Sequence, residues 1–309
     1  WVCGTGSFFV RPLSNLDSQF LALLIRSPEY RERLENLSTG TTMKNLSNTV
    51  LSSLAISVPS LPEQQRIVGI LDEAFDGIAT AKANAEKNLQ NARALFESHV
   101  QSVFTRRGDG WADKRLDDVC VIGDGNHSSN YPKKEELVSE GIPFIRATNL
   151  VAGEICEIDM RFLSPEKHAQ LKKGHLKTGD ILFTNRGEIG KTAIVDADHD
   201  GSNLNSQIAW LRCDKTLNNR FLFHLLSSGA IKSHLESAKS GAALQQFTIR
   251  QIKELAIPCP PKHEQDALVV GLDGLSEETQ RLESLYQRKL TALDELKKSL
   301  LHQAFSGAL

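Results

Sequence analysis

Polar side chains gather in four short groups along the chain, each beside a short apolar segment. Arg, Asn and Gln can make bidentate contacts to the edges of nucleic-acid bases, whereas Lys, Ser and Thr suit phosphate groups. The groups therefore allow a nucleic-acid interface, but a solvated polar surface explains them equally well. They are Asn126, His127 and Ser128 with Lys133; Arg146 with Thr148 and Asn149; Thr184, Asn185 and Arg186 with Lys191; and Asn203 with Asn205 and Gln207.

Signatures of catalysis are weaker. Gly187–Thr192 (Gly-Glu-Ile-Gly-Lys-Thr) is similar to the end of a phosphate-binding loop, but Asn185 stands where that motif requires glycine. His127 next to Ser128 could indicate nucleophilic chemistry, although a polar surface loop is the simpler interpretation. The histidines show no HExxH or other metal-ligand spacing, and no GxSxG motif is present. We therefore expect no catalysis, no cofactor and no metal site, and an enzyme with an unrecognised site is the alternative.

Length and composition restrict the class of protein. The 309 residues predict two or three domains, and a hydrophobic fraction of 40% is enough for a packed core. No apolar run reaches the roughly 18 residues that span a membrane, and residues 1–15 do not resemble a signal peptide. We expect a cytoplasmic protein with no membrane partner. The cysteines are odd in number and lie far apart in the sequence, which predicts reduced thiols. The five are Cys3, Cys120, Cys156, Cys213 and Cys259.

Charge argues against nucleic-acid binding by a large positive field. The formal net charge is −2, and residues 111–201 carry 12 Lys and Arg against 16 Asp and Glu. A protein that binds nucleic acid by its own field needs an excess of positive charge. Binding within a larger, more basic assembly is still compatible with this composition.

The strongest signal is an internal duplication at an offset of 201 residues. Residues 1–108 align with residues 202–309 without a gap, and positions 20–72 are identical to 221–273 at 16 of 53 sites. Repeats of solenoid proteins run about 20–50 residues, so this offset indicates two copies of a domain-sized unit. Residues 109–201 precede the second copy only, and the chain begins with Trp1. We expect one and a half units, with about 93 residues missing before the first copy.

The sequence of each copy predicts short helices followed by one very long helix. Apolar spacing predicts helical structure within residues 20–37, a loop at 38–42, a short helix at 48–54 capped by Ser47 and a strand at 55–58. Ser60 and Glu63 have the spacing of a capping box. The helix that follows extends to about Phe104, which would make it about 65 Å long.

A seven-residue apolar repeat runs along both long helices. A seam of that length needs a partner helix, and the helix of the other copy is the obvious one. The alternative is two independent amphipathic helices that lie on globular domains. The first helix carries Leu71, Ile78, Ala85 and Ala92 on one seam and Ala74, Ala81 and Leu95 on the other; the second carries Leu272, Tyr286, Leu293 and Leu300, with Leu275, Leu282 and Leu296.

Residues 111–218 differ from the repeated segments, because their apolar pieces are short and broken by Gly, Asn, Asp and Pro. Short apolar runs of this kind predict strands joined by polar loops, and Leu163–Leu171 predicts a short helix. The fold class is therefore mixed α/β, with a compact domain and two long antiparallel helices. The predicted strands are Val119–Ile122, Ile142–Ile145, Ile181–Thr184, Ala193–Val195 and Ile208–Leu211.

Four features of the sequence combine in a specific way. Three are the segments Gly141-Ile-Pro-Phe-Ile-Arg-Ala-Thr-Asn149, Leu176-Lys-Thr-Gly-Asp-Ile-Leu-Phe183 with Arg186-Gly-Glu-Ile-Gly-Lys191, and Ile56-Ser-Val-Pro-Ser-Leu-Pro-Glu-Gln-Gln-Arg-Ile67. The fourth is the duplication with a long helix after each copy. The third segment differs in the second copy of the duplication, where Lys262-His263 replace Leu61-Pro62 of the first copy. Together these features, which cover nearly the whole chain, resemble the DNA-specificity subunit of Type I restriction-modification systems.

The resemblance implies two target-recognition domains joined by two long antiparallel helices. Each domain would read one half of a split DNA site in the major groove, and the helices would act as a spacer and a dock for two DNA methyltransferase subunits. A restriction subunit would join that core. The resemblance also implies that this subunit carries out no chemistry itself, in line with the absence of an NPPY-type methyltransferase motif.

The resemblance divides the chain into four segments and gives its polar groups a role. Residues 1–58 would be the remnant of a first recognition domain, 59–108 the first spacer helix, 109–260 a second recognition domain and 261–309 the second spacer helix. For the helix or partner interface we predict Leu71, Ile78, Leu95, Leu272, Leu282, Leu293 and Leu296. For DNA contact we predict Asn126, His127, Ser128, Lys133, Arg146, Asn149, Thr184, Asn185, Arg186 and Lys191.

Four alternatives stay open at this point. Arg146 could instead pair with a buried carboxylate such as Asp180, and Asn149 could cap a turn. The chain could be a coiled-coil assembly protein that no longer reads DNA. It could also be a half-size specificity subunit that self-associates.

Overall fold

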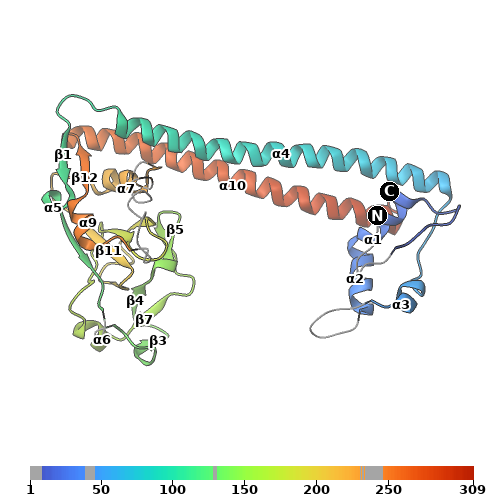
Figure 1. Ribbon diagram of the computed structural model, residues 1–309, viewed down its shortest axis with the longest axis horizontal. Helices are drawn as coiled ribbons and strands as arrows, with labels where there is room; N and C mark the ends of the chain where they lie inside the picture. The colour runs from blue at the N-terminus through green and yellow to red at the C-terminus, as the bar shows by residue number, and fades with distance from the viewer. Residues whose placement is uncertain (1–8, 39–45, 128–130, 230, 232, 234–245) are drawn as a thin grey trace. The chain divides into compact units, whose positions relative to one another are not determined.

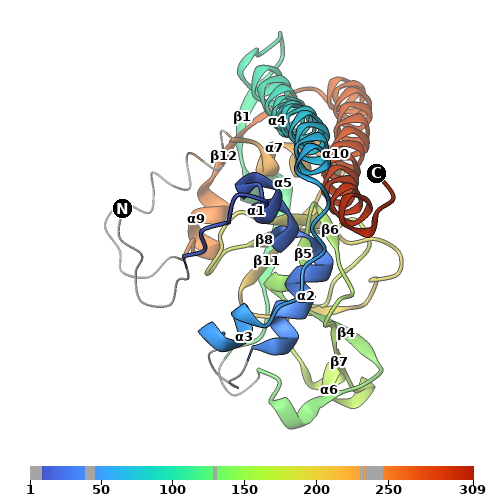
Figure 2. The same ribbon diagram turned by 90° about the vertical axis from the view of Figure 1, so that its right-hand side faces the viewer.

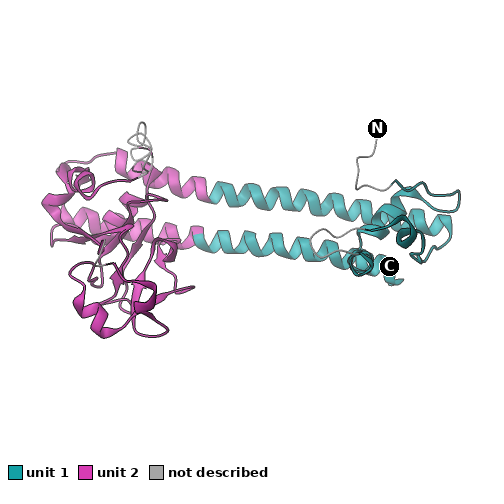
Figure 3. Ribbon diagram, turned by 60° about the horizontal axis from the view of Figure 1, so that its bottom comes forward, with its two compact units in different colours: residues 1–92, 280–309 teal, residues 93–279 magenta. Residues whose placement is uncertain are grey.

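The computed structural model describes residues 9–38, 46–127, 131–229, 231, 233 and 246–309. The chain divides into two compact units, which are described separately (Figure 3). Unit 1 comprises residues 1–92 and 280–309, and unit 2 comprises residues 93–279. Two helices of 45 residues each contribute to both units: α4 (Leu61–Thr105) and α10 (Lys262–Ser306). The predicted mixed α/β class with two long helices is therefore confirmed.

Unit 1 is helical in its described part (Figure 1). Its short helices are α1 (Ser18–Arg26), α2 (Pro28–Leu37) and α3 (Asn48–Ser52). Asp17 caps α1 by accepting hydrogen bonds from two backbone amides, and Ser47 caps α3 as predicted. The core forms where Phe20 and Leu24 of α1 meet Leu71 of α4 and Leu301 of α10. The predicted loop at 38–42 lies, beyond Ser38, outside the described residues.

Two local predictions in unit 1 were wrong. Residues 55–58 form no strand, whereas their counterpart in unit 2, β12 (Ala256–Cys259), pairs with β1 (Ala112–Arg115). A counterpart of β1 at the offset of 201 would lie before residue 1, so residues 55–58 lack that pairing partner within the chain. The capping box is also absent, because Glu63 binds the guanidinium of Arg66 at 2.7 and 2.9 Å.

The duplication is visible in the hydrogen bonds of two buried glutamines. In unit 1, Gln64 Oε1 accepts from the backbone of Asp17, and Nε2 donates to the carbonyls of Asn15 and Pro59. In unit 2, Gln265 makes the same three bonds with partners exactly 201 residues later in each case. Those partners are Asn218, Thr216 and Pro260. Each glutamine therefore links the start of its long helix to the loop that precedes a short helix of the same copy. That short helix is α1 in unit 1 and its counterpart α7 (Asn219–Ser227) in unit 2.

Unit 2 contains two four-stranded sheets. The first sheet has the order β2-β11-β8-β9 and is antiparallel throughout. It consists of β2 (Cys120–Asp124), β8 (Ile181–Thr184), β9 (Thr192–Ile194) and β11 (Ile208–Cys213). The second has the order β10-β4-β7-β3, with strands β3 (Leu137–Val138), β4 (Ile142–Ile145), β7 (Arg161–Leu163) and β10 (Asn203–Leu204). A small hairpin joins β5 (Leu150–Val151) to β6 (Glu154–Ile155).

Helices cover both ends of unit 2. α7 (Asn219–Ser227) lies on the side of the first sheet away from β4 and β7, and α6 (Pro165–Gln170) lies beyond these two strands (Figures 1 and 2). α5 (Leu116–Val119) and α9 (Ile249–Glu254) flank β2. Phe221 of α7 packs against Phe104 of α4 with ring centroids 5.3 Å apart, inside the largest core cluster.

The predicted strands match the structure closely. β4 and β8 have the predicted bounds, and β2, β9 and β11 differ by one or two residues. The predicted helix at 163–171 is shorter, because residues 161–163 form β7 and Ser164 then caps α6. The sequence did not predict the two-residue strands, which are too short to show an apolar period.

Each long helix uses the other as a partner, so the interpretation as independent amphipathic helices was wrong. In unit 1, Leu71 shares a core with Leu301, and Lys82 Nζ lies 2.7 Å from Asp294 Oδ1. In unit 2, Val100 and Leu272 share a core. Of the predicted interface residues, Leu71, Ile78 and Leu272 are buried and Leu282 and Leu293 are half-buried. Leu95 and Leu296 are 66% and 46% exposed, so they lie outside the seam, and their contact with a partner stays a prediction.

Candidate nucleic-acid interface

Three of the four polar groups lie at one end of the first sheet of unit 2, where strands β2 and β8 end and β11 begins. β11 begins there, with Ile208 opposite Thr184 of β8 and Ala209 opposite Asp124 of β2. Because β2 and β8 run antiparallel to β11, both strands end where β11 starts. The loops that leave β2 and β8 therefore lie beside the segment that enters β11. We call the surface formed by residues 124–127, 146–149, 184–191 and 203–207 the loop-end surface.

The remaining polar group, Arg146 with Thr148 and Asn149, joins this surface through a parallel strand pair. β10 lies beside β4, with Leu204 opposite Ile145, and the Asn205 amide donates to the Ile145 carbonyl at 2.9 Å. Asn205 therefore sits next to Arg146. The ring of Tyr131 packs on Phe144 at 5.8 Å. Burial raises the pKa of the Tyr131 phenol, against the opposing effects of the Arg146 charge and a hydrogen bond with Asn205.

The segment 187–191 is a hairpin turn between β8 and β9. Thr184 organises it, since its hydroxyl donates to the Glu188 carbonyl and accepts from the Lys191 amide. Gly187 and Gly190 have φ values of 77° and 97°, which favour glycine. The hairpin turn accounts for both glycines of this segment, and only Gly190 coincides with a glycine that the phosphate-binding motif requires.

A tight backbone contact joins the first and fourth polar groups. A Cβ atom on Gly125 would lie 2.6 Å from the carbonyl oxygens of Leu204 and Asn205. No side chain fits there without a shift of one loop against the other. Gly125 therefore allows the loop after β2 to lie directly on the segment that enters β11.

The side chain of His127 is held by a carboxylate. Its Nε2 lies 2.6 Å from Asp124 Oδ2, and Lys173 Nζ lies 3.0 Å from the other oxygen of Asp124. Burial raises the pKa of Asp124, but the hydrogen bonds from His127 and Lys173 outweigh it and hold the pKa below its ordinary value. Asp124 is therefore ionised, and part of its charge is compensated within the surface.

Four of the predicted DNA-contact residues are buried and bonded within unit 2. Asn126 binds the backbone of Lys172 and Lys173, and the buried Thr184 holds the hairpin. Asn149 accepts from the Arg146 amide and donates to two carbonyls, so it caps a turn, as one alternative proposed. The backbone of the buried Asn185 is bonded to Gln207 and Phe247.

The other sequence alternative, an ion pair between Arg146 and Asp180, was wrong. Asp180 binds Arg212 instead, with two bonds of 2.7 Å, and is itself buried. Arg146 donates to the Asp159 carbonyl at 2.5 Å. Its buried Nε and the buried Oδ1 of Asn185 have no hydrogen-bond partner. An unpartnered buried polar atom costs about 1–3 kcal/mol, and such atoms are few in folded proteins.

The remaining predicted residues lie at the surface. Arg186 donates to Gln246 Oε1 at 3.1 Å, and Lys191 Nζ lies 2.8 Å from Glu188. Lys133 is exposed and precedes a short 3-10 helix at Lys134–Glu136. Ser128 lies outside the described residues.

Sequence reasoning did not select several residues that the structure brings to this surface. Asn205 and Gln207 bind each other at 3.0 Å beside the start of β11, and Gln246 bridges to Arg186. Asn205 and Gln207 belong to the fourth polar group, so their side-chain type was the available signal. Gln246 lies 60 residues after Arg186, and no local pattern could have joined them.

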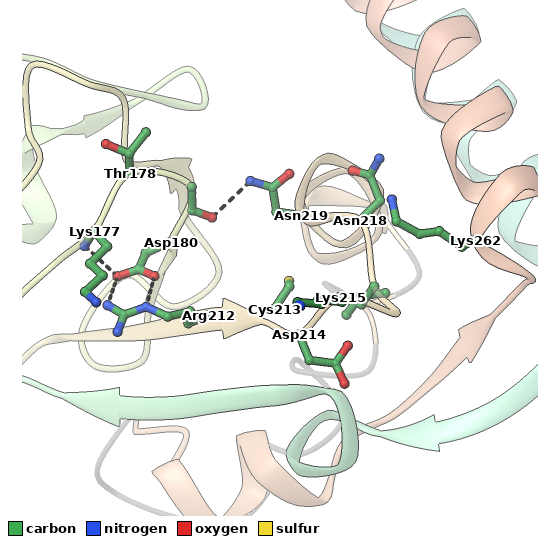
Figure 4. Close-up of a pocket in the computed structure, with 12 residues that line it drawn as sticks. Lys177, Thr178, Asp180, Arg212, Cys213, Asp214, Lys215, Asn218, Asn219 and Lys262 are labelled. Carbon is green, nitrogen blue, oxygen red and sulfur yellow. Dashed lines mark hydrogen bonds and ion pairs between the residues drawn. The ribbon is translucent and has the colours of Figure 1, made fainter.

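A hollow of unit 2 lies away from this surface. Its volume is about 360 Å³, and it lies between the end of β11 and the start of α7 (Figure 4). Lys177, Lys215 and Lys262 line it together with Arg212, which is bound to Asp180. In the described part of the chain, no three His, Cys, Asp or Glu side chains form a group that could hold a metal ion, and no helix is long and apolar enough to cross a membrane.

A comparison with family models matches most of the chain. Residues 1–90 and 108–291 match the model of the Type I restriction modification DNA specificity domain. The curated relatives are specificity subunits of Type I restriction enzymes. The EcoBI subunit of Escherichia coli is 24% identical over 91% of this chain and 64% of its own length. The EcoKI subunit of E. coli strain K12 is 23% identical over 99% and 69%, and the MjaIX subunit of Methanocaldococcus jannaschii is 26% identical over 81% and 60%.

Solved structures share the fold. One, from work on complex assembly and conformational transition of the type I R-M system, has a TM-score of 0.80 at 21% identity and covers 96% of this chain and 72% of its own. The HsdS subunit from Thermoanaerobacter tengcongensis has a TM-score of 0.59 at 22% identity and covers 96% and 71%. The chain therefore spans about two thirds of the length of its relatives.

Proposed function

Because the chain belongs to the Type I restriction modification DNA specificity domain family, we propose that it recognises DNA sequence for a Type I restriction-modification complex. Unit 2 reads one half of a split site in double-stranded DNA, and the paired long helices hold DNA methyltransferase subunits, which a restriction subunit joins. The chain itself carries out no reaction, and it works in the cytoplasm. The observation that carries the proposal is the loop-end surface, where three polar segments at one end of the first sheet meet a fourth segment that follows β4 of the second sheet.

The ten predicted contact residues divide into two roles. The exposed or half-buried cations Lys133, Arg146, Arg186 and Lys191, together with His127, contact DNA directly. The buried side chains of Asn126, Asn149 and Thr184 hold the loops in position, since each of them bonds to backbone groups of loop residues. Asn185 is also buried, but its bonds to Gln207 and Phe247 come from its backbone. Ser128 shares the loop of His127 and stays a candidate on its sequence position alone.

The acidic composition of residues 111–201 fits recognition inside an assembly. Phosphate contacts dominate the affinity of most DNA-binding proteins, but Asp and Glu outnumber Lys and Arg by 16 to 12 in residues 111–201. Partner subunits bound to the long helices would supply that positive surface. Unit 2 then contributes mainly base contacts, which determine sequence preference rather than affinity.

The first experiment is the selection of DNA fragments from a random pool by the chain bound to its methyltransferase subunit. One short motif supports a single working recognition domain. Two motifs at a fixed spacing would show that two chains pair to form a complete specificity unit, as the half-size alternative predicts. Binding to the methyltransferase with no enriched motif would contradict the proposal and favour an assembly protein that does not read DNA.

Substitutions of the predicted contact residues separate base contacts from phosphate contacts. Arg186→Ala at a base contact costs about 1–3 kcal/mol of binding and relaxes the preference at one base pair. Lys133→Ala at a phosphate contact weakens binding to all sequences and lowers the salt slope by about one. The matched control is Arg115→Ala, because Arg115 is exposed and lies before the opposite end of β2. An equal loss in the control would remove the support for this surface.

A further inference from the structure

Two cysteines face each other across the first sheet of unit 2. Cys120 of β2 lies directly opposite Cys213 of β11, and their Sγ atoms are 3.8 Å apart. The thiol of Cys120 donates to the sulfur of Cys213. Neither residue belongs to the loop-end surface, because Cys120 starts β2 and Cys213 ends β11.

The strand register suits a bond between these sulfurs. The Asp214 amide donates to the Val119 carbonyl at 2.9 Å, which makes Val119 and Asp214 the hydrogen-bonded pair of the ladder. The next pair, Cys120 and Cys213, is therefore a non-hydrogen-bonded pair, in which Cα atoms lie about 4.5 Å apart. That spacing falls within the range of about 4.4–6.8 Å that disulfides require. A rotation of the two side chains, without a change of register, would bring the sulfurs into bonding distance.

The two thiols differ in access. Cys213 is half-buried and lines the hollow of about 360 Å³ at the end of β11 (Figure 4). Cys120 is buried. Lys177 and Lys215 line the same hollow, and the carboxylate of Asp214 is engaged by the amide and hydroxyl of Thr216. An anionic reagent is therefore attracted to the side from which Cys213 can be reached.

The proton between the two sulfurs lies on the buried Cys120. The hydrogen bond to Cys213 and burial raise the pKa of the Cys120 thiol far above its ordinary value. Cys120 therefore does not react first with an external reagent, because the thiolate is the nucleophile. It lies in position to attack the sulfur of Cys213 once that sulfur has been oxidised.

We propose that Cys213 and Cys120 form a thiol–disulfide exchange site for small anionic disulfides. The Cys213 thiolate attacks one sulfur of the reagent, whose S–S bond breaks and releases one thiolate. The Cys120 thiol then loses its proton, and its sulfur attacks Cys213. The mixed disulfide breaks, and the second reagent thiolate leaves and takes up the proton. The two protein thiols are oxidised by two electrons, and the reagent disulfide is reduced to two thiols.

Cys259 is the nearest competitor for this reaction, and the structure restrains it. Its sulfur accepts a hydrogen bond from the buried Gln265 at 3.6 Å and donates to the Pro260 carbonyl at 3.9 Å. Cys259 lies on β12, in a different sheet from β2 and β11. We therefore expect a specific bond between Cys120 and Cys213 rather than a mixture of pairings.

The test treats the full chain with oxidised glutathione and identifies its products by intact mass and peptide mapping. The expected product has lost two hydrogens and contains a Cys120–Cys213 disulfide. Cys120→Ser should stop at one glutathione on Cys213, and Cys213→Ser should leave Cys120 unmodified. Cys156→Ser is the matched control, because Cys156 is also half-buried and should not affect the product. Circular dichroism verifies that each variant is folded.

A second arm tests the role of charge in the hollow. Lys215→Gln should slow the reaction with oxidised glutathione but not the reaction with neutral hydroxyethyl disulfide. Equal rates for both reagents would overturn the anionic preference. A folded wild-type chain in which Cys120 and Cys213 stay reduced, or in which Cys120 pairs with Cys259, would overturn the exchange site itself.

Discussion

Replacing Gln265 by methionine tests how the start of α10 is attached to unit 2. The side chain of Gln265 is fully buried and accepts a hydrogen bond of 2.7 Å from the Asn218 amide. It also donates to the carbonyls of Thr216 and Pro260 at 3.1 and 2.8 Å. Methionine has nearly the same shape but no donor, and its sulfur accepts hydrogen bonds only weakly. Three backbone groups would therefore lose their partner at once.

The size of the effect follows from those three groups. A buried polar group left without its partner costs about 1–3 kcal/mol, and losses within one cluster are not additive. We expect a loss of about 2–4 kcal/mol in the opening free energy of the surrounding backbone. At 1.4 kcal/mol for each factor of ten, hydrogen exchange there should accelerate at least about 30-fold. The helix that should show it first is α7, which Asn218 caps.

The duplication supplies a matched variant for this experiment. Gln64→Met removes the same three bonds in unit 1, where Asp17 caps α1. Hydrogen exchange measured by mass spectrometry should show the larger acceleration in α7 for the first variant and in α1 for the second. Gln287→Met, at an exposed site of α10, should change neither helix. No acceleration in either variant, or equal acceleration of both helices in each, would refute the assignment of these glutamines as anchors.

Three further changes have expected outcomes. Gly125→Ala should cost about 1–3 kcal/mol in urea unfolding and blur the selected DNA motif, because the added Cβ displaces the loop that rests on Asn205; unchanged stability and an unchanged motif would contradict this. Burial lowers the pKa of His224 despite its bond to Asp273, so the unfolded chain binds more protons just below pH 6.5 and stability should fall as the pH drops through that value. The His224→Gln variant should show a flatter pH dependence in thermal unfolding, and an unchanged slope would contradict the assignment. Gly69→Ala should stabilise α4 by about 0.5–1 kcal/mol, since the helix is open there and alanine loses less entropy; a lower melting temperature would argue against that.

The sequence was most informative where a pattern was long or repeated. The long helices followed from a seven-residue seam, and the offset of 201 correctly placed α10 from α4, whose starts differ by exactly that number. Strands β4 and β8 were predicted with their exact bounds because short buried strands are continuous apolar runs between polar turns. The strand at 55–58 failed for the opposite reason, since a strand is stabilised by its neighbour and the local sequence does not contain that neighbour.

The composition of the candidate surface was predictable, but the roles of its residues were not. Asn126 and Asn149 have the side-chain type of base-reading residues, yet both are buried and hold backbone groups. An amide that caps a buried turn and an amide that reads a base have the same chemistry. Only the path of the neighbouring loops distinguishes them, and that path depends on contacts such as Asn203 Nδ2 with the Lys173 carbonyl, 30 residues away.

Under the proposed division of roles, a domain with many fixed polar side chains could still change its target. A buried amide bonded to three backbone groups cannot be replaced without cost, because each group would lose its partner. The half-buried Arg186 and the exposed Lys133 have few such bonds and can be exchanged with little effect on stability. Sequence preference would therefore change at these positions while the buried asparagines and Gly125 keep the loops in place. A variant of Asn149 should accordingly lose stability before it changes the recognised motif.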